Sequence, residues 1–314
     1  MPIPVELMLQ SDTGLVKFEL VADCLVLMSG HAGSGSNYAA SQAIACRPVR
    51  SARVMTPGES RSWLRTFGSV EGRAQLVCVP HAGSGASCFA VWRRHLPVEV
   101  KLVAVQLPGR EDRWREPPMT DIGAAADQLV PQLEPAISAR STVLFGHSMG
   151  GLLAHALQRR LEDIGRPAAH LIVSGCHPSD HPVPRRRIGH LGDDDFVAEI
   201  RSRGGMPAEL LKPQVLKMFL PALRADIRMA ESYYPSPDRP LRGPLSAFGG
   251  EQDIHVPWEG VLEWRRHTSA QFDATPFQGS HFFVNTARQE VVAAVQSIMV
   301  AVMGRSVSPA EKLK

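Results

Sequence analysis

Residues 146–150 read Gly-His-Ser-Met-Gly, a spacing that can make a serine hydroxyl a nucleophile. The segment follows a run at 141–145 that is rich in β-formers, and it precedes a stretch from Gly151 that is typical of a helix start. Gly-x-Ser-x-Gly between a strand and a helix is the sequence of a nucleophile elbow, a tight turn that holds the serine above the edge of a sheet. Its glycines allow strained backbone angles and close packing of strand against helix. Because the short pattern alone is common, the flanking strand and helix carry the prediction that Ser148 is the nucleophile.

A serine nucleophile needs a base and an orienting carboxylate, and the chain offers both after later strands. In the α/β-hydrolase arrangement the partners follow in the order serine, acid, histidine. Asp253 follows the strand-like run 245–250, and His281 follows the strand-like run 272–277. Open α/β sheets carry their sites at the carboxyl ends of the strands. We therefore expect the three side chains to meet at one edge of a sheet, with Asp253 as the acid and His281 as the base.

Each of these assignments has a competing interpretation. The chain holds 12 histidines, so His281 taken alone is more often a surface or structural residue. Asp253 taken alone suits a helix cap before residues 256–258, because aspartate favours such positions. Asp180 is a rival acid, since it lies shortly after the strand-like run 171–176. We favour Asp253 because a Gly-Gly-x-x-Asp sequence ends a strand at the usual position of the acid.

A loop of small residues could supply the second half of an oxyanion hole. Residues 75–80 are typical of an early strand, and residues 81–87 read His-Ala-Gly-Ser-Gly-Ala-Ser. Such a loop lets a backbone N–H approach a substrate oxygen, and we predict the amides of Ala82 and Met149 as the two donors. A plain glycine turn and a phosphate-binding loop are the alternatives. The spacings of the common nucleotide-binding loops are absent, which disfavours a nucleotide site.

Together these segments resemble the stand-alone type II thioesterases that accompany polyketide synthases and nonribosomal peptide synthetases. The Leu-Pro-Gly-Arg-Glu and His-Phe-Phe sequences are far more specific than the elbow. The matching segments keep the family's order between about residues 62 and 300, and they are 80–83, 106–111, 146–151, 248–250 with Asp253, and 279–283. Ser84 stands where a Gly-Gly pair is commoner, a departure that should leave the oxyanion amide intact.

The resemblance implies an α/β-hydrolase fold with a mostly parallel central sheet, helices on both faces and a helical lid insertion. It implies that Ser148 attacks, His281 acts as base and Asp253 orients the base. The implied reaction is hydrolysis of acyl groups from the phosphopantetheine thiol of acyl or peptidyl carrier domains, which clears aberrant or stalled chains without a cofactor. An esterase or acyltransferase with the same triad is the alternative. A non-catalytic binding protein fits less well, because silent relatives commonly lose a triad member.

Composition and patterning predict one α/β domain with additions. The chain has 314 residues, 44% of them hydrophobic, and strand–helix alternation begins near residue 73. We predict a poorly ordered extension at 1–54, a hydrolase domain at 55–305 and a tail at 306–314; a functional amino-terminal arm is the alternative. The lid is expected at about 180–240, where 193–203 and 209–234 have helical spacing.

Net charge, the length of apolar runs and cysteine content limit the partners and the cellular location that the chain could have. A net charge of +3 without an aromatic-interleaved basic motif disfavours nucleic acid. Runs near the length of a membrane helix, about 18 apolar residues, are absent. Five scattered cysteines suit a reducing cytoplasm and give no metal spacing. We expect a cytoplasmic monomer without metal. The arginines at 185–187, 201 and 203 could steer acidic carriers, although such charges are often only a solvated face.

Overall fold

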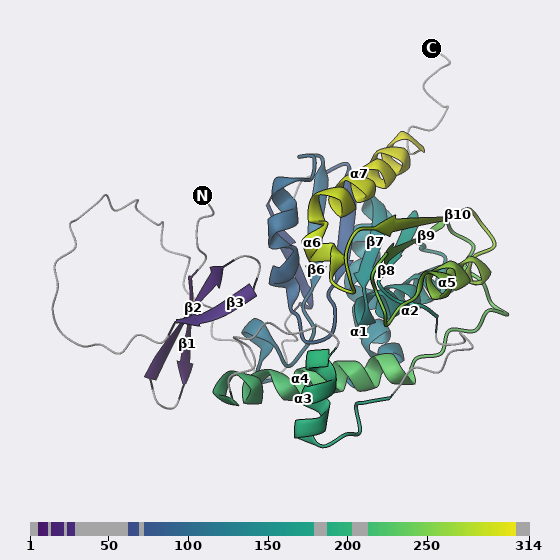
Figure 1. Cartoon of the computed structure of the whole chain (residues 1–314). Coiled ribbons are helices and arrows are strands. Elements are labelled where there is room, and N and C mark those ends of the chain that lie inside the picture. The colour runs from purple at the N-terminus through teal and green to yellow at the C-terminus, as the bar shows by residue number, and fades with distance from the viewer. Residues whose placement is uncertain are drawn as a thin grey trace, which may run out of the picture. The chain divides into compact units, whose positions relative to one another are not determined.

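The computed structural model of the chain describes residues 6–11, 14–21, 24–28, 62–68, 72–178, 187–202 and 213–305 (Figure 1). By its internal contacts the chain divides into two units, Met1–Ser62 and Trp63–Lys314. The predicted boundary between residues 54 and 55 falls eight residues before this division. The carboxyl-terminal tail at 306–314 lies outside the described residues.

The first unit contains a small antiparallel sheet. Its strands pair in the order β1-β2-β3. Their bounds are β1 (Glu6–Ser11), β2 (Gly14–Val21) and β3 (Cys24–Met28). The three segments are rich in Leu, and β2 and β3 also contain Val, a residue that favours strands. Part of the predicted extension at 1–54 therefore has regular structure, and the rest of that prediction lies outside the described residues.

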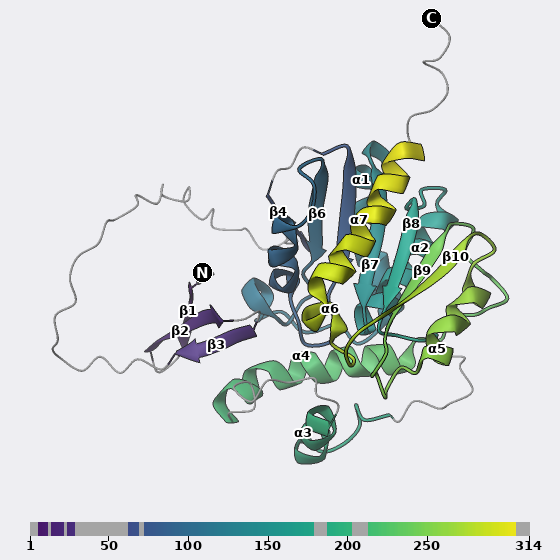
Figure 2. The same cartoon turned by 45° about the horizontal axis from the view of Figure 1, so that its top comes forward.

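The second unit is built on a seven-stranded sheet in the order β10-β9-β8-β7-β5-β6-β4 (Figure 2). All neighbouring strands run parallel except β4, which pairs antiparallel with β6 at the edge. The strands are β4 (Leu64–Phe67), β5 (Ala74–Val79), β6 (Val100–Val105), β7 (Ser141–His147), β8 (His170–Ser174), β9 (Leu245–Gly250) and β10 (Phe272–Phe277). Central parallel strands are covered on both faces, so they form near-continuous apolar runs. The predicted strands at 245–250 and 272–277 are confirmed to the residue.

Helices cover both faces of this sheet and create two cores. Figure 2 shows α7 crossing one face, with α1 and α2 behind the other. One core packs α1 and α2 against the strands, and the second packs a short 3₁₀ helix, η1, and α7 against the opposite face. The bounds are η1 (Ala86–Arg94), α1 (Ile122–Ala139), α2 (Met149–Asp163) and α7 (Arg288–Arg305); the shorter helices are η2 (Glu111–Arg113), α5 (Trp258–Leu262), η4 (Glu263–His267) and α6 (Phe283–Thr286). The loops that follow β5, β7, β9 and β10 therefore lie at the same edge of the sheet, the edge formed by the carboxyl ends of these strands. None of the helices in the described ranges is long and apolar enough to cross a membrane.

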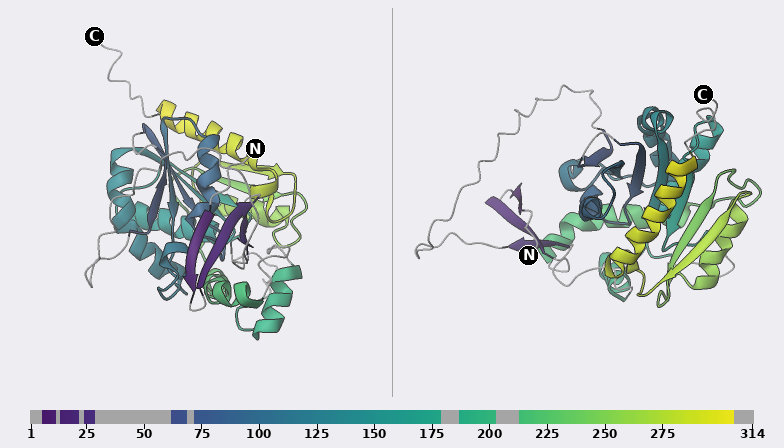
Figure 3. Two further views of the ribbon diagram at one scale, coloured as in Figure 1. Left: turned by 90° about the vertical axis from the view of Figure 1, so that its left-hand side faces the viewer. Right: turned by 90° about the horizontal axis from the view of Figure 1, so that it is seen from above.

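A helical insertion lies between β8 and β9. Its helices are α3 (Asp193–Ser202) and α4 (Pro213–Ser232), drawn in green at one end of the sheet in Figures 1 and 3. They correspond to the predicted helices at 193–203 and 209–234, but α4 ends two residues earlier than predicted, and residues 203–212 lie outside the described ranges. Proline suits the first position of α4, because its missing N–H has no helical acceptor there. A small apolar core centred on Phe196 and Leu223 holds the two helices together, and Ala82 packs against it.

Candidate active site

Ser148 occupies a strained turn between β7 and α2. Its φ of 56° and ψ of −123° are unusual for a side chain with a β-carbon, and Glu111 is the other described non-glycine residue with a positive φ. The amide of Ser148 donates to the carbonyl of Ser174 at 2.7 Å, and the amide of Gly151 donates to the carbonyl of Ser148 at 2.9 Å. This is the geometry of a nucleophile elbow, as the motif predicts.

The glycines of the elbow are required by close contacts. A β-carbon on Gly146 would lie 2.0 Å from the carbonyl oxygen of Gly150, and one on Gly150 would lie 2.2 Å from that of Val79. A β-carbon on Gly151 would lie 2.5 Å from the sulfur of Cys176, a buried thiol that packs as a small apolar group. Larger residues at these three positions would push α2 away from the sheet. The sequence Gly-x-Ser-x-Gly-Gly is thus a packing requirement of this turn.

The structure brings Ser148, His281 and Asp253 into one hydrogen-bonded chain. The Oγ of Ser148 lies 3.0 Å from Nε2 of His281, and Nδ1 of His281 lies 2.7 Å from Oδ2 of Asp253. The Asp253 side chain is fully buried, whereas 16% of the His281 side chain is exposed. The three residues follow the carboxyl ends of β7, β9 and β10, as expected for an open α/β sheet. The rival acid, Asp180, lies outside the described residues.

Asp253 performs two tasks with its two oxygens. Oδ2 faces His281, while Oδ1 accepts the amides of His255 and Val256 at 2.9 and 3.1 Å. Asp253 therefore accepts the amides of the turn that follows it while its other oxygen faces His281; the helix that follows begins later, at Trp258, and its N-cap residue is Pro257. Burial by itself raises the pKa of Asp253, but the hydrogen bond and charge of His281 and the two amides together hold this pKa below the usual aspartate value. The carboxylate is thus kept ionised beside the imidazole.

The two backbone amides predicted for an oxyanion hole lie at the start of α2 and in the loop after β5. Met149 is the first residue of α2, so its N–H has no acceptor within the helix, and the helix dipole favours negative charge there. Ala82 lies in the loop after β5. Side chains from outside this loop accept hydrogen bonds from the amides of later loop residues. Gly83 donates its amide to Asp226 Oδ2 at 2.8 Å, and Ala86 donates its amide to Gln106 Oε1 at 2.6 Å.

A buried ion pair connects this loop to the helical insertion. Arg110 donates to both carboxylate oxygens of Asp226, at 2.5 Å (Nη1 to Oδ2) and 2.9 Å (Nη2 to Oδ1). Both side chains are buried, with 2% and 0% exposed. Arg110 and Gln106 belong to the Gln-Leu-Pro-Gly-Arg-Glu segment, and the next residue, Glu111, accepts the hydroxyl of Ser87 at 2.6 Å. This segment therefore holds the loop that carries Ala82, a role that its sequence did not reveal.

Two further imidazoles lie beside His281. His147 and His81 have ring centroids 6.0 Å apart, and the His147 centroid lies 5.4 Å from that of His281. Burial, and then the proximity of His281, lowers the pKa of His81 to about 4. Burial, followed by the charges of His281 and His81, places the pKa of His147 well below its usual value. Both rings are therefore neutral near pH 7.

Stability should fall as the pH drops from about 6.5 towards 4. In the unfolded chain these histidines titrate near their ordinary pKa of about 6.5. Between that value and the folded pKa of about 4 for His81, the unfolded chain binds a proton that the folded chain does not. A depressed folded pKa makes the free energy of unfolding rise with pH in this window, by about 1.4 kcal/mol per unit for each imidazole. Urea midpoints at pH 7, 6 and 5 measure this slope.

A third buried imidazole offers the control. Burial, and then His267 and Arg159, hold the pKa of His155 well below the usual value, and this ring lies in α2 away from the triad. His155→Gln should make the slope shallower without changing the triad. Midpoints that do not move between pH 7 and 5 in the parent protein would contradict the expectation.

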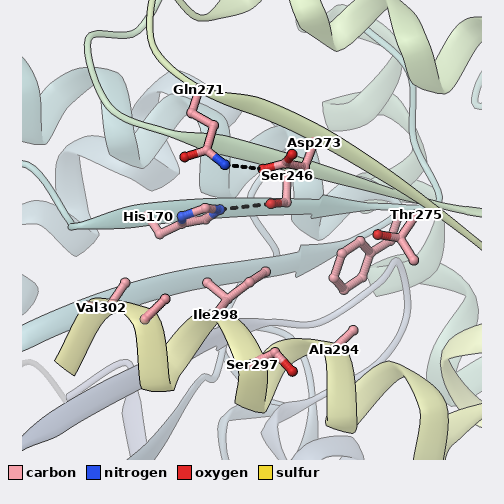
Figure 4. Close-up of a pocket in the computed structure, with 11 residues that line it drawn as sticks. His170, Ser246, Gln271, Asp273, Thr275, Ala294, Ser297, Ile298 and Val302 are labelled. Carbon is pink, nitrogen blue, oxygen red and sulfur yellow. Dashed lines mark hydrogen bonds between the residues drawn. The ribbon is translucent and has the colours of Figure 1, made fainter. Parts of the chain in front are cut away.

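A cavity of about 420 Å³ lies away from Ser148, between β8, β9, β10 and α7 (Figure 4). Figure 4 shows His170 bonded to Ser246, and Gln271 bonded to Asp273, on the sheet side of this cavity. His170 begins β8, whereas the opposite end of that strand contacts Ser148. The cavity is therefore separate from the triad. Within the described residues, no group of three His, Cys, Asp or Glu side chains could hold a metal ion.

Comparison with known proteins supplies the family. A family model described as "Thioesterase domain" matches residues 74–299. Linear gramicidin dehydrogenase LgrE of Brevibacillus parabrevis is 35% identical over 236 residues, covering 74% of this chain and 89% of that protein. Thioesterase PikA5 of Streptomyces venezuelae is 35% identical over 249 residues, covering 78% of this chain and 88% of that protein.

A solved structure agrees with the sequence relatives. YbtT, a type II thioesterase from the yersiniabactin pathway, superposes with a TM-score of 0.70 at 31% identity, covering 77% of this chain and 100% of that chain. The name of LgrE denotes a different reaction, so the assignment rests on the domain match and on the thioesterases. The chain belongs to the thioesterase domain family and is an α/β-hydrolase that acts on thioesters.

Proposed function

We propose that this enzyme hydrolyses acyl groups from the phosphopantetheine thiol of carrier proteins, and that it removes aberrant or stalled chains during polyketide or nonribosomal peptide synthesis. The observation that carries the chemistry is the continuous chain of hydrogen bonds from Ser148 through His281 to Asp253. The names of relatives support the substrate class, since YbtT is described as a type II thioesterase of a pathway that combines both kinds of synthesis.

Acylation begins when Ser148 Oγ attacks the thioester carbonyl carbon. His281 Nε2, 3.0 Å from that oxygen, takes the hydroxyl proton, and Asp253 stabilises the imidazolium through Nδ1. The carbonyl oxygen becomes an oxyanion that accepts the amides of Met149 and Ala82. The carbon–sulfur bond then breaks, and the thiol leaves with the proton from His281. The acyl group stays on Ser148 as an ester.

Deacylation repeats the same steps with water. His281 takes a proton from the water as its oxygen adds to the ester carbonyl, and the same amides hold the second oxyanion. The bond to Ser148 Oγ breaks, and His281 returns the proton to that oxygen. The product is the free carboxylic acid.

The helical insertion would act as the lid over this site. Ala82 packs against the apolar core of α3 and α4, so an acyl chain bound at the oxyanion amides would meet apolar side chains. Arg187 begins the described part of the insertion, and its exposed guanidinium donates to the hydroxyl of Tyr234. Arg185, Arg186 and Arg203 lie outside the described residues. Steering of an acidic carrier by these arginines remains part of the proposal.

The cellular setting is also inferred. Among the residues whose side chains the structure describes, Cys78, Cys88 and Cys176 take part in no disulfide, which suits a reducing cytoplasm. We infer a cytoplasmic enzyme that acts as a monomer on acyl or peptidyl carrier domains. No step of the mechanism requires a cofactor.

The function is tested by intact-mass spectrometry of carrier proteins. Carriers loaded with acetyl, longer acyl or aminoacyl groups are weighed before and after exposure to the enzyme. The expected result is return of the carrier to its free-thiol mass with release of the acid, and no change with Ser148→Ala. Unchanged acyl-carriers that coexist with hydrolysis of small esters would favour the esterase alternative.

Two additions separate the remaining alternatives. A nucleophilic alcohol or amine present in the assay would collect the acyl group if the enzyme were an acyltransferase. A fluorophosphonate probe labels Ser148 in an active hydrolase but not in a non-catalytic binding protein.

A further inference from the structure

Ser174, the last residue of β8, contacts two functional parts of the site. Its carbonyl oxygen accepts the amide of Ser148 at 2.7 Å, at the point where the elbow is strained. Its hydroxyl lies 3.0 Å from Nδ1 of His147, the residue opposite it on β7. The side chains of Ser174 and His147 are both completely buried. One residue therefore supports the nucleophile through its backbone and a buried imidazole through its side chain.

That imidazole lies directly behind the base. The ring centroid of His147 is 5.4 Å from that of His281 and 5.4 Å from that of Phe283. Gly175 also lies close to this ring: it has a φ of +57°, and a β-carbon there would lie 2.5 Å from Cε1 of His147. Packing therefore leaves the His147 ring little room to move. The ring can still rotate about its Cβ–Cγ bond, and the hydrogen bond between Nδ1 and the Ser174 hydroxyl restricts that rotation.

The His147 ring is neutral, which suits its position next to His281. Burial, and then the charges of His281 and His81, keep the pKa of His147 well below its usual value. A neutral ring can rest against His281 while that residue gains a proton, because no second positive charge opposes it. A neutral imidazole also offers one donor and one acceptor, so it can pair with a hydroxyl.

We propose that Ser174 is a positioning residue that holds the Ser148 elbow through its carbonyl and, through its hydroxyl, the His147 ring against which His281 rests. This inference rests on the triad proposed above. Ser174 contacts the Ser148 amide and the His147 ring, and these contacts do not involve the Ser148 Oγ. It acts by keeping the Ser148 oxygen and the His281 nitrogen in line, and misplacement of reacting groups by about 1 Å can cost on the order of 100-fold in rate.

The chain offers a matched control for this bond. His170 Nε2 lies 2.8 Å from the hydroxyl of Ser246, which is also a buried histidine–serine bond between neighbouring strands of the same sheet (Figure 4). That bond joins β8 to β9 at the end of β8 opposite Ser174. Ser174→Ala and Ser246→Ala therefore remove the same chemical group from the same sheet, one beneath the triad and one away from it.

The experiment compares these variants with the full-length parent on an acyl-N-acetylcysteamine thioester. Ser174→Ala should lower kcat between about 5- and 50-fold and leave KM within about twofold. The rate of fluorophosphonate labelling of Ser148 should fall by the same factor. Ser246→Ala and the hydroxyl-retaining Ser174→Thr should each stay within about twofold of the parent. Melting temperatures of both alanine variants should fall by similar amounts.

The outcomes separate this inference from the proposed function. If the parent hydrolyses the thioester and the two alanine variants have equal kcat, the positioning role of Ser174 is overturned but the proposed function is not. A kcat loss of the same size in Ser174→Thr would overturn it too, because the hydroxyl would then be irrelevant. Absence of parent turnover on thioesters would overturn the proposed function, while the labelling rate of Ser148 would still decide the role of Ser174. Should Ser174→Ala not fold, His147→Phe breaks the same bond, keeps a ring behind His281 and should lose at least about fivefold in kcat.

Discussion

Ser148→Ala should abolish formation of the acyl-enzyme while leaving the melting temperature within about 2 °C of the parent, since one small hydroxyl is lost from the surface of the site. His281→Ala should be nearly as severe, because the hydroxyl then has no base. Loss of a single triad member commonly costs between about 10⁴- and 10⁶-fold in kcat. Steady-state turnover of an acyl-N-acetylcysteamine thioester, with single-turnover mass spectrometry of the enzyme, measures both effects.

Asp253→Asn should be milder and more informative. The asparagine carbonyl can still accept the amides of His255 and Val256, so the turn should persist. The amide group would instead donate towards His281 Nδ1 and favour the wrong tautomer of the ring, which costs about 10⁴-fold in the best-known serine hydrolase. Near-full activity of Asp253→Asn together with loss in Asp180→Asn would show that the acid has been assigned to the wrong residue.

Asp226→Ala should produce the largest loss of stability. It removes one partner of a pair whose side chains are 2% and 0% exposed, and it leaves the Arg110 guanidinium buried without its counter-charge. Breaking such a pair typically costs about 3–5 kcal/mol. For a domain of this size the melting temperature should fall on the order of 10 °C. The amide of Gly83 also loses its acceptor, which adds to the effect.

Asp193→Asn is the matched control. Asp193 pairs with Arg224 of α4, whose Nη2 lies 2.7 Å from Asp193 Oδ1; 15% of the Arg224 side chain and 74% of the Asp193 side chain are exposed, so water reaches the carboxylate. Exposed pairs contribute at most about 1 kcal/mol, so its melting temperature should change by no more than about 3 °C. The double variant Arg110→Met with Asp226→Leu should recover much of the stability, because both charges are gone. Equal melting temperatures for Asp226→Ala and the parent would refute the role assigned to the pair.

The sequence predicted the sheet and the meeting of the triad because these depend on local patterns. Strand-forming runs end at Gly250 and Phe277, and each of the predicted acid and base follows one of them within a few residues. The parallel topology then brings their carboxyl ends together. Local reasoning is sufficient here because each residue needs only its own strand and turn to reach the common edge.

The supporting residues could not be predicted in this way. Arg110 and Asp226 lie 116 positions apart, and Asp226 stands in an amphipathic helix where charged residues are ordinary. Only the packing of α4 against the loop after β5 shows that this aspartate is buried. An apolar residue does not by itself identify the packed face of such a helix, because Met218 of α4 is 52% exposed. Which face of an inserted helix is covered depends on neighbours that the sequence does not name.

The triad joins residues that are far apart along the chain, and this has a consequence for folding. The bond between Ser148 and His281 spans 133 positions, and the last strand and helices of the domain must be in place before it can form. Contacts with such long sequence separation generally form late, because closing a long loop costs entropy before any contact is made. During synthesis the serine therefore leaves the ribosome long before its base does. The chain should remain inert towards acyl intermediates until the whole sheet has been assembled, so that hydrolytic activity marks the completed fold.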